Sequence, residues 1–131
     1  MKTINEKNLE GFLSEEQLFV QLPLMLRLTM TNKSAFAAAV KQGYIELGED
    51  GYLEWKLGGK TLLAYFLGRL FCGDNSAYST RKSGMVWTPG KGVFPGAQLA
   101  HLFNAPSLKI IRKRRSYGQL PEHFELIDIL F

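Results

Sequence analysis

The sequence predicts a mainly α-helical protein with one small antiparallel β-hairpin, an α+β fold of the helix-turn-helix or winged-helix type. Three observations lead to this class: apolar residues recur at helical spacing, a Gly- and acid-rich turn joins two alternating runs, and two short amphipathic segments flank a tight turn. The 131 residues have the length of one domain. We expect a single domain over residues 1–131. Residues 14–57 would supply N-terminal helices and an acidic hairpin, and residues 60–131 a buried helix, a long loop, a basic helix pair and a terminal helix.

The N-terminal helices are predicted from local signals. Ser14–Gln17 has the pattern of a capping box, in which Ser and Gln side chains and backbone N–H groups satisfy each other at a helix start. Pro23 lies inside the apolar pattern that follows and should kink or split that helix. The Ala-rich segment Ala35–Gln42 predicts a further helix, with Gly43 at its C-terminal end.

Two alternating runs, Tyr44–Leu47 and Tyr52–Trp55, are joined by a turn with an Asp-Gly pair and predict the β-hairpin. Two interpretations fit: the wing of a winged helix, or a β element that covers one side of the core. A wing that contacts DNA is usually basic, because it meets phosphates. This hairpin carries acids instead: Glu46, Glu49, Asp50 and Glu54.

The segment Lys60–Cys72 is the most apolar helix expected in the chain. Apolar side chains surround nearly its whole circumference, so it should be the central buried helix, with Gly68 allowing another element to approach closely. The following connection, Gly73–Gly96, is rich in Gly, Ser and Pro, and we expect little regular structure through most of it. Phe124–Phe131 is expected to close the fold as a terminal helix.

The helix pair lies in Ala97–Arg115. Apolar spacing predicts a first helix, which Asn104 can end in the left-handed conformation and Pro106 prevents from continuing. Ser107 is a suitable N-cap for a second helix. That helix carries apolar residues for a core and a run of cations for an acidic partner: Leu108, Ile110 and Ile111, with Lys109, Arg112, Lys113, Arg114 and Arg115.

Charge is segregated along the chain although the net charge is only +4. Residues 1–55 contain five basic and eight acidic residues, and residues 119–131 contain three acids and no Lys or Arg. Residues 56–118 contain eleven basic residues and one acid. A positive face attracts polyanions whatever the overall charge. The alternative is that these Lys and Arg residues are solvated at helix ends, where they complement the helix dipole.

From this pattern we expect double-stranded DNA as the partner and a role as a DNA-binding accessory or transcriptional regulatory protein. The expected contacts come from the basic helix pair: Gln98, Ser107, Lys109, Arg112, Lys113, Arg114 and Arg115. The competing hypothesis is a non-enzymatic protein-interaction module. In that case the acidic hairpin or the aromatic residues of the long loop would bind a protein, and the basic helix would only be solvated.

Enzymatic, metal and cofactor sites are not expected. Gly59 and Lys60 follow a strand and open a helix, but Glu54 occupies the position where a phosphate-binding loop needs its first Gly. Cys72, His101 and His123 do not have the spacing of a zinc site. No acid pairing suggests general acid–base chemistry.

A cytoplasmic location without membrane contact is expected. The single cysteine excludes an intrachain disulfide and favours a reducing compartment. The first residues lack the apolar run of a signal peptide, and the longest apolar stretch, Leu62–Leu67, is far too short to cross a bilayer.

Three segments also resemble a known family. The runs Leu53–Phe66 (L-E-W-K-L-G-G-K-T-L-L-A-Y-F), Leu102–Asn104 and Ile110–Arg114 look like the C-terminal domain of RteC-type regulators of conjugative transposons. The chain is also similar to small uncharacterised proteins of such mobile elements. The resemblance spans about residues 51–115, and the long connection at 73–96 departs from it. It implies a winged-helix DNA-binding or regulatory role carried by Lys109, Arg112, Lys113 and Arg114.

Overall fold

The computed structural model describes residues 14–79, 84–114 and 119–131. These ranges contain seven helices and two two-stranded antiparallel sheets, so the α+β class is confirmed, with two hairpins where one was expected. In chain order the elements are α1 (Glu15–Val20), α2 (Leu24–Thr29), α3 (Lys33–Lys41), β1 (Ile45–Leu47), β2 (Leu53–Trp55), α4 (Lys60–Cys72), β3 (Asn75–Ser79), β4 (Gly84–Thr88), α5 (Gly96–Leu102), α6 (Leu108–Arg114) and α7 (Phe124–Asp128).

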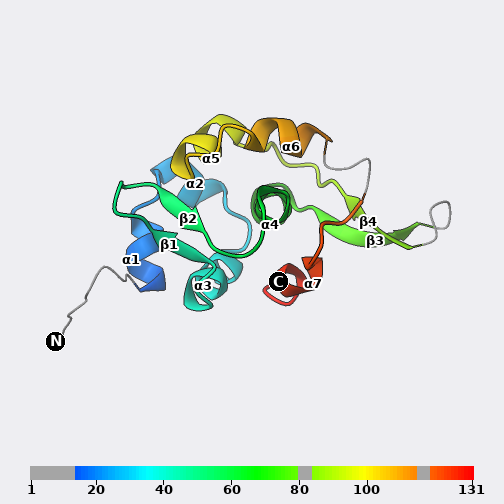
Figure 1. Ribbon diagram of the computed structural model, residues 1–131, viewed down its shortest axis with the longest axis horizontal. Coiled ribbons are helices and arrows are strands. Elements are labelled where there is room, and N and C mark those ends of the chain that lie inside the picture. The colour runs from blue at the N-terminus through cyan, green and yellow to red at the C-terminus, as the bar shows by residue number, and fades with distance from the viewer. Residues whose placement is uncertain (1–13, 80–83, 115–118) are drawn as a thin grey trace.

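Helix α4 is the centre of the fold, as predicted. Figure 1 shows it nearly end-on, with α5 and α6 on one side and α3 and α7 on the other. Ten of its residues are buried, and only polar or terminal positions reach solvent. It ends at Gly73, whose φ of 81° is the left-handed conformation that glycine adopts without strain. None of the helices in the described ranges is long and apolar enough to span a membrane.

The N-terminal predictions are confirmed. The Ser14 hydroxyl accepts from the Gln17 N–H at 3.2 Å, and the Gln17 side chain accepts from the Ser14 N–H at 2.9 Å, which completes the capping box. Pro23 splits the apolar segment into α1 and α2. Helix α3 starts two residues earlier than the Ala-rich run, because Asn32 caps it by accepting from the Ala35 N–H at 3.0 Å.

The first hairpin, β1–β2, has the predicted position and pairs Ile45 with Trp55 and Leu47 with Leu53. It packs against the core through Trp55, which stacks on Phe66 of α4 with ring centres 5.4 Å apart. It therefore covers one side of the core next to α4. Whether it also acts as a wing stays a prediction, as does the helix-turn-helix assignment.

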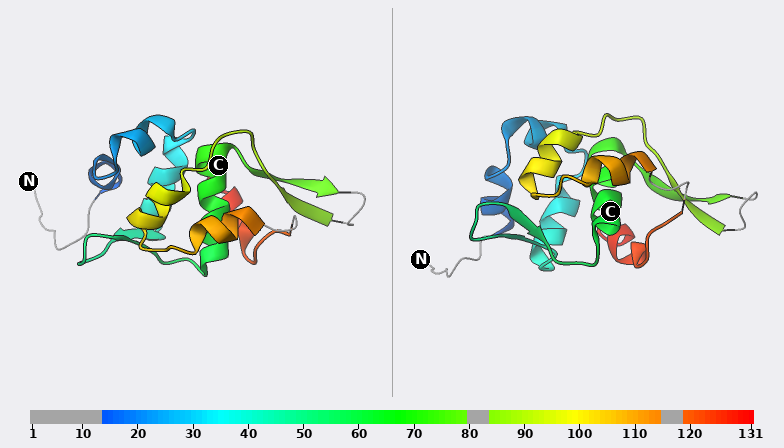
Figure 2. Two further views of the ribbon diagram at one scale, coloured as in Figure 1. Left: turned by 90° about the horizontal axis from the view of Figure 1, so that it is seen from above. Right: turned by 45° about the horizontal axis from the view of Figure 1, so that its top comes forward.

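The expectation of little regular structure between residues 73 and 96 is wrong for much of this segment. Strands β3 and β4 form a hairpin that pairs Asn75 with Thr88 and Ala77 with Val86, and it projects from the body (Figure 2). The many Gly and Ser residues of this segment favour an irregular loop, although part of the segment forms strands. Burial of Trp87 at the base of the hairpin supplies the apolar anchor that the local pattern does not reveal.

The helix pair α5–α6 has the predicted turn. Asn104 adopts a φ of 48°, and the Ala105 N–H donates to the Ala100 carbonyl at 2.7 Å, which closes the end of α5. Leu99 and Leu108 are buried, so both helices attach to the core through their apolar faces. The predicted terminal helix is also present, as the shorter α7.

The central role of α4 predicts a large difference between two Leu-to-Ala substitutions. Leu70 is 0% exposed in α4, whereas Leu28 is 70% exposed on α2. Leu70→Ala should lower the free energy of unfolding by about 2–5 kcal/mol, because it removes buried contacts and leaves a cavity. Leu28→Ala should change it by about 0.5 kcal/mol or less. Urea unfolding followed by circular dichroism measures both, and equal losses would contradict α4 as the core.

Candidate nucleic-acid interface

A buried carboxylate, Asp74, fixes the position of the predicted DNA-contacting helix. It is the single acid in residues 56–118, and its side chain is 0% exposed. It accepts hydrogen bonds from Trp87 Nε1 at 2.8 Å, from the Gly90 N–H at 2.7 Å and from Arg112 Nη2 at 2.9 Å, and Arg112 Nη1 pairs with its other oxygen. These four residues form the Asp74 cluster, which joins α4, β4, the loop before α5, and α6.

Two glycines allow the Asp74 cluster to form. A Cβ at Gly68 would collide with the Asp74 carboxylate and lie 2.8 Å from Arg112 Nη1. A Cβ at Gly90 would collide with the Cys72 carbonyl oxygen and lie 2.6 Å from the carbonyl carbon of the next residue. The close approach predicted at Gly68 is therefore confirmed, and the groups that approach are the two charged side chains of the cluster.

Helix α6 has two chemically different faces. Leu108, Ile111 and Arg112 point toward α4, where Leu108 is fully buried and the Arg112 side chain is 11% exposed. The Phe94 ring lies 5.2 Å from the Arg112 guanidinium and covers it from the side of the loop. The opposite face of α6 is exposed and carries Lys109, Ile110, Lys113 and Arg114.

The seven predicted contact residues therefore have different surroundings. Lys109, Lys113 and Arg114 are exposed on α6 and together form what we call the basic face. Gln98 is exposed on α5, and Ser107 is half-buried directly before α6, where its carbonyl accepts from the Ile111 N–H at 2.9 Å. Arg112 belongs to the Asp74 cluster, and Arg115 lies outside the described residues.

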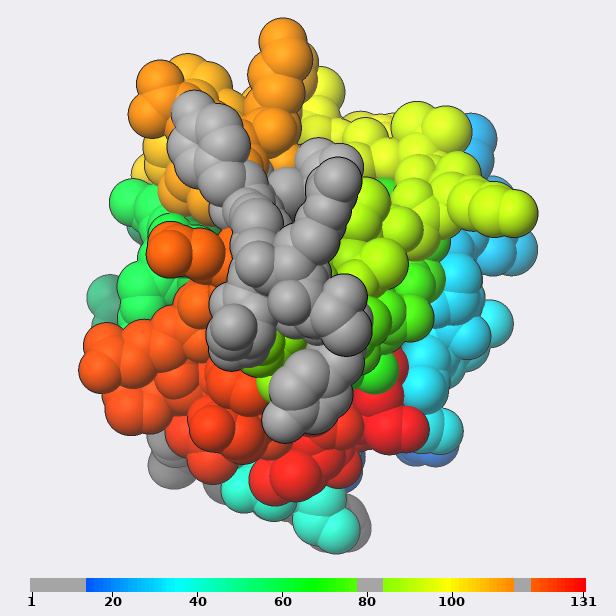
Figure 3. Space-filling view, turned by 90° about the vertical axis from the view of Figure 1, so that its right-hand side faces the viewer, coloured from blue at the N-terminus to red at the C-terminus, as the bar shows by residue number. Residues whose placement is uncertain are grey.

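Helices α5 and α6 carry no acidic residue. The sequence contains no Asp or Glu between residues 75 and 121. Figure 3 shows α6 and the loop before α5 along one edge of the molecule and α7 along the opposite edge. The exposed acids of the described residues lie on α1, on the β1–β2 hairpin and around α7: Glu16, Glu49, Asp50, Glu54, Glu122 and Glu125.

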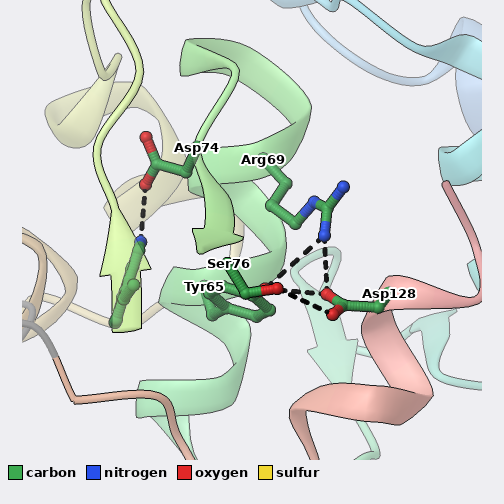
Figure 4. Close-up of polar contacts among 6 residues, drawn as sticks. Tyr65, Arg69, Asp74, Ser76 and Asp128 are labelled. Carbon is green, nitrogen blue, oxygen red and sulfur yellow. Dashed lines mark hydrogen bonds and ion pairs between the residues drawn. The ribbon is translucent and has the colours of Figure 1, made fainter. Parts of the chain in front are cut away.

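A second polar cluster holds α7 against α4 (Figure 4). Asp128 accepts hydrogen bonds from the Tyr65 hydroxyl at 2.7 Å, from Arg69 Nη1 at 2.6 Å and from the Ser76 hydroxyl at 3.1 Å. The Phe131 ring lies 4.5 Å from the Arg69 guanidinium. Burial is the larger cause that raises the pKa of Tyr65 above its usual 10.0, and the hydrogen bond to Asp128 is the second.

Neither polar cluster was predicted from the sequence. One signal for the first was present: a lone acid after a Gly, in a segment otherwise rich in cations, needs a specific reason to be there. No local signal marked Asp128, because its partners lie 52 to 63 residues away in the chain.

A cleft of about 800 Å³ lies where β2, the start of α4 and the α5–α6 turn meet. Its walls include Tyr52, Trp55 and Phe103, and its charged residues have both signs. The structure brings no three His, Cys, Asp or Glu side chains together for a metal ion within the described ranges. The described charges of the basic face are all positive, and such a face attracts an anionic surface.

Comparison with known proteins gave no match: no protein-family model, no curated protein and no solved structure is significantly similar to this chain. The resemblance to RteC-type regulators stays a prediction.

The Asp74 cluster predicts strong coupling between two substitutions. Asp74→Asn should lower the free energy of unfolding by about 3–5 kcal/mol, because it leaves the buried Arg112 guanidinium without its counter-charge. Arg112→Met should also destabilise, but the double variant should lose less than the two single losses together. Urea unfolding measures all three.

The exposed Glu54–Lys56 pair, with a 2.7 Å separation, is the control for this cycle. Glu54→Gln should cost about 0–1 kcal/mol, since both side chains face solvent. Additive losses at Asp74 and Arg112 would show that the buried pair is not the unit that holds α6.

The raised pKa of Tyr65 predicts a loss of stability at alkaline pH. Tyr65 ionises near pH 10 in the unfolded chain and at higher pH in the folded protein. The stabilisation of the folded protein by neutral Tyr65 is therefore complete below about pH 10 and decreases as the pH rises further. Tyr65→Phe should cost about 1 kcal/mol at pH 7, from the hydrogen bond to Asp128. Urea unfolding from pH 8 to 11 should show the difference between the two proteins shrinking, and a constant difference would contradict the assignment.

Proposed function

We propose that this chain binds double-stranded DNA through the basic face of α6, as an accessory or transcriptional regulatory protein. One observation carries the proposal: α6 is fixed to α4 along one side, while three cations stand exposed on the other side with no acid in the surrounding sequence. DNA is the polyanion for which such a helix face is suited, because phosphates line both walls of each groove.

The two lysine charges on this face are available to a ligand. Lys109 and Lys113 are four residues apart and so lie on one line along the helix. Neither makes an ion pair with any of the described residues. Their positive charge is therefore not compensated within this part of the protein, which favours release of counterions when phosphates replace them.

The Asp74 cluster supports the proposal by holding α6 in place before a ligand arrives. The two hydrogen-bonded contacts from Arg112 to Asp74 fix the rotation of α6 about its axis as well as its distance from α4. A helix held in this way loses little conformational freedom on binding. We therefore assign Arg112 to positioning, and the phosphate contacts to the three residues of the basic face.

The test is binding to a random-sequence DNA duplex, measured by fluorescence anisotropy across a series of salt concentrations. Wild-type binding should weaken linearly on a log–log plot of affinity against salt. Lys109→Gln/Lys113→Gln should bind more weakly, with a slope smaller by about 1.8, since each phosphate contact contributes about 0.9.

Lys33→Gln/Lys41→Gln is the matched control, because it removes two exposed charges from α3, on the other side of α4. Its slope should equal that of the wild type. Absence of binding at low salt, or equal weakening by both double variants, would show that the basic face is not a DNA site.

A protein-interaction module is the second candidate, and a specific observation favours it. Helix α2 exposes three large apolar side chains, Leu24, Met25 and Leu28, on one side, and Val20 at the end of α1 is exposed as well. Exposed apolar patches of this kind often mark protein-interaction surfaces. This candidate assigns no ligand to Lys109 and Lys113, so failure of duplex binding at low salt would favour it.

A further inference from the structure

Ile110 is an exposed apolar residue in the middle of a charged surface. The expectation that this residue belongs to the core is wrong, because its side chain is 57% exposed on α6, between Lys109, Lys113 and Arg114. The other aliphatic residues of this helix, Leu108 and Ile111, face the core. Phosphates offer no apolar partner, so the cations of the basic face do not explain why an Ile stands among them.

The helical geometry places Ile110 on the most outward part of α6. At about 100° per residue, the line opposite the buried side chains passes between Ile110 and Lys113. Lys109 and Arg114 lie on either side of that line. A flat or concave ligand that meets α6 from outside therefore reaches Ile110 and Lys113 first, and the other two cations at its margins.

This arrangement, an outward apolar residue surrounded by cations, matches the chemistry of the DNA major groove. The groove is wide enough to accept an α-helix, with base edges on its floor and phosphates along both walls. The C5-methyl group of thymine is the apolar group that base pairs present there. A single apolar residue surrounded by like charges is, in contrast, too small a patch for docking a protein.

We infer that α6 enters the major groove with Ile110 against thymine methyl groups, so that Ile110 determines a preference for A·T-containing sites. This inference rests on the proposed function, since it requires that α6 binds duplex DNA. The roles divide accordingly: the long side chains of Lys109, Lys113 and Arg114 contact phosphates and supply affinity, and Ile110 contacts bases and supplies discrimination.

The test compares two duplexes of equal length and alternating sequence, d(AT) and d(AU), which differ only in the C5-methyl group. Affinities are measured by fluorescence anisotropy at one low salt concentration. The wild type should bind d(AT) about three- to fourfold more tightly, which corresponds to burial of one methyl group per contact.

Ile110→Ala should bring the ratio of the two affinities close to one, while its affinity for d(AU) stays near that of the wild type. Ile129→Ala is the matched control, because Ile129 is 75% exposed at the end of α7, away from the basic face. The control should keep the wild-type ratio. Thermal unfolding should be unchanged for both variants, since neither side chain is part of the core.

The outcomes distinguish failure of the role inferred for Ile110 from failure of the proposed DNA binding. Equal wild-type affinities for d(AT) and d(AU), with binding that still weakens in salt, would overturn the role of Ile110 and leave DNA binding in place. A thymine preference that persists in Ile110→Ala would overturn it as well. No binding to either duplex at low salt would overturn the proposed function, and with it this inference.

Discussion

The arrangement of α4, β4 and α6 depends on how one buried carboxylate is compensated. A charge without contact to water is costly unless hydrogen bonds and an opposite charge surround it. Asp74 satisfies this requirement with donors from three parts of the chain: the Trp87 indole, the Gly90 backbone and the Arg112 guanidinium. None of these segments can move away without removing a hydrogen bond or the opposite charge from the buried carboxylate, so they hold one another in place.

A carboxylate that gathers donors from several segments occurs twice around α4. Asp128 gathers Tyr65 and Arg69 much as Asp74 gathers Trp87 and Arg112, in each case with an aromatic donor and a guanidinium. The rings of Tyr65 and Trp87 meet edge to face with centres 5.2 Å apart, so the two clusters are in contact through aromatic groups. The most apolar helix of the chain thus receives α6 and α7 through polar contacts as well as apolar ones.

Features that depend on neighbouring residues could be predicted from the sequence. The capping box at Ser14, the break at Pro23 and the left-handed Asn104 each follow from local backbone chemistry, and the structure shows them. Features that depend on distant partners could not. The β3–β4 hairpin is anchored by Trp87 in a site built from other segments, and Arg112 is diverted from solvent by an acid 38 residues away. Within a run of cations, the sequence does not distinguish a residue that pairs internally from one that meets solvent.

The projecting β3–β4 hairpin has a mechanical consequence. Its base is attached through Trp87 to the same carboxylate that holds Arg112 of α6. A load applied to the hairpin is therefore transmitted to α6 through short, directional bonds and not through a flexible linker. Displacing either the hairpin base or α6 would remove a donor from the buried Asp74 carboxylate, so each of these two elements resists movement of the other.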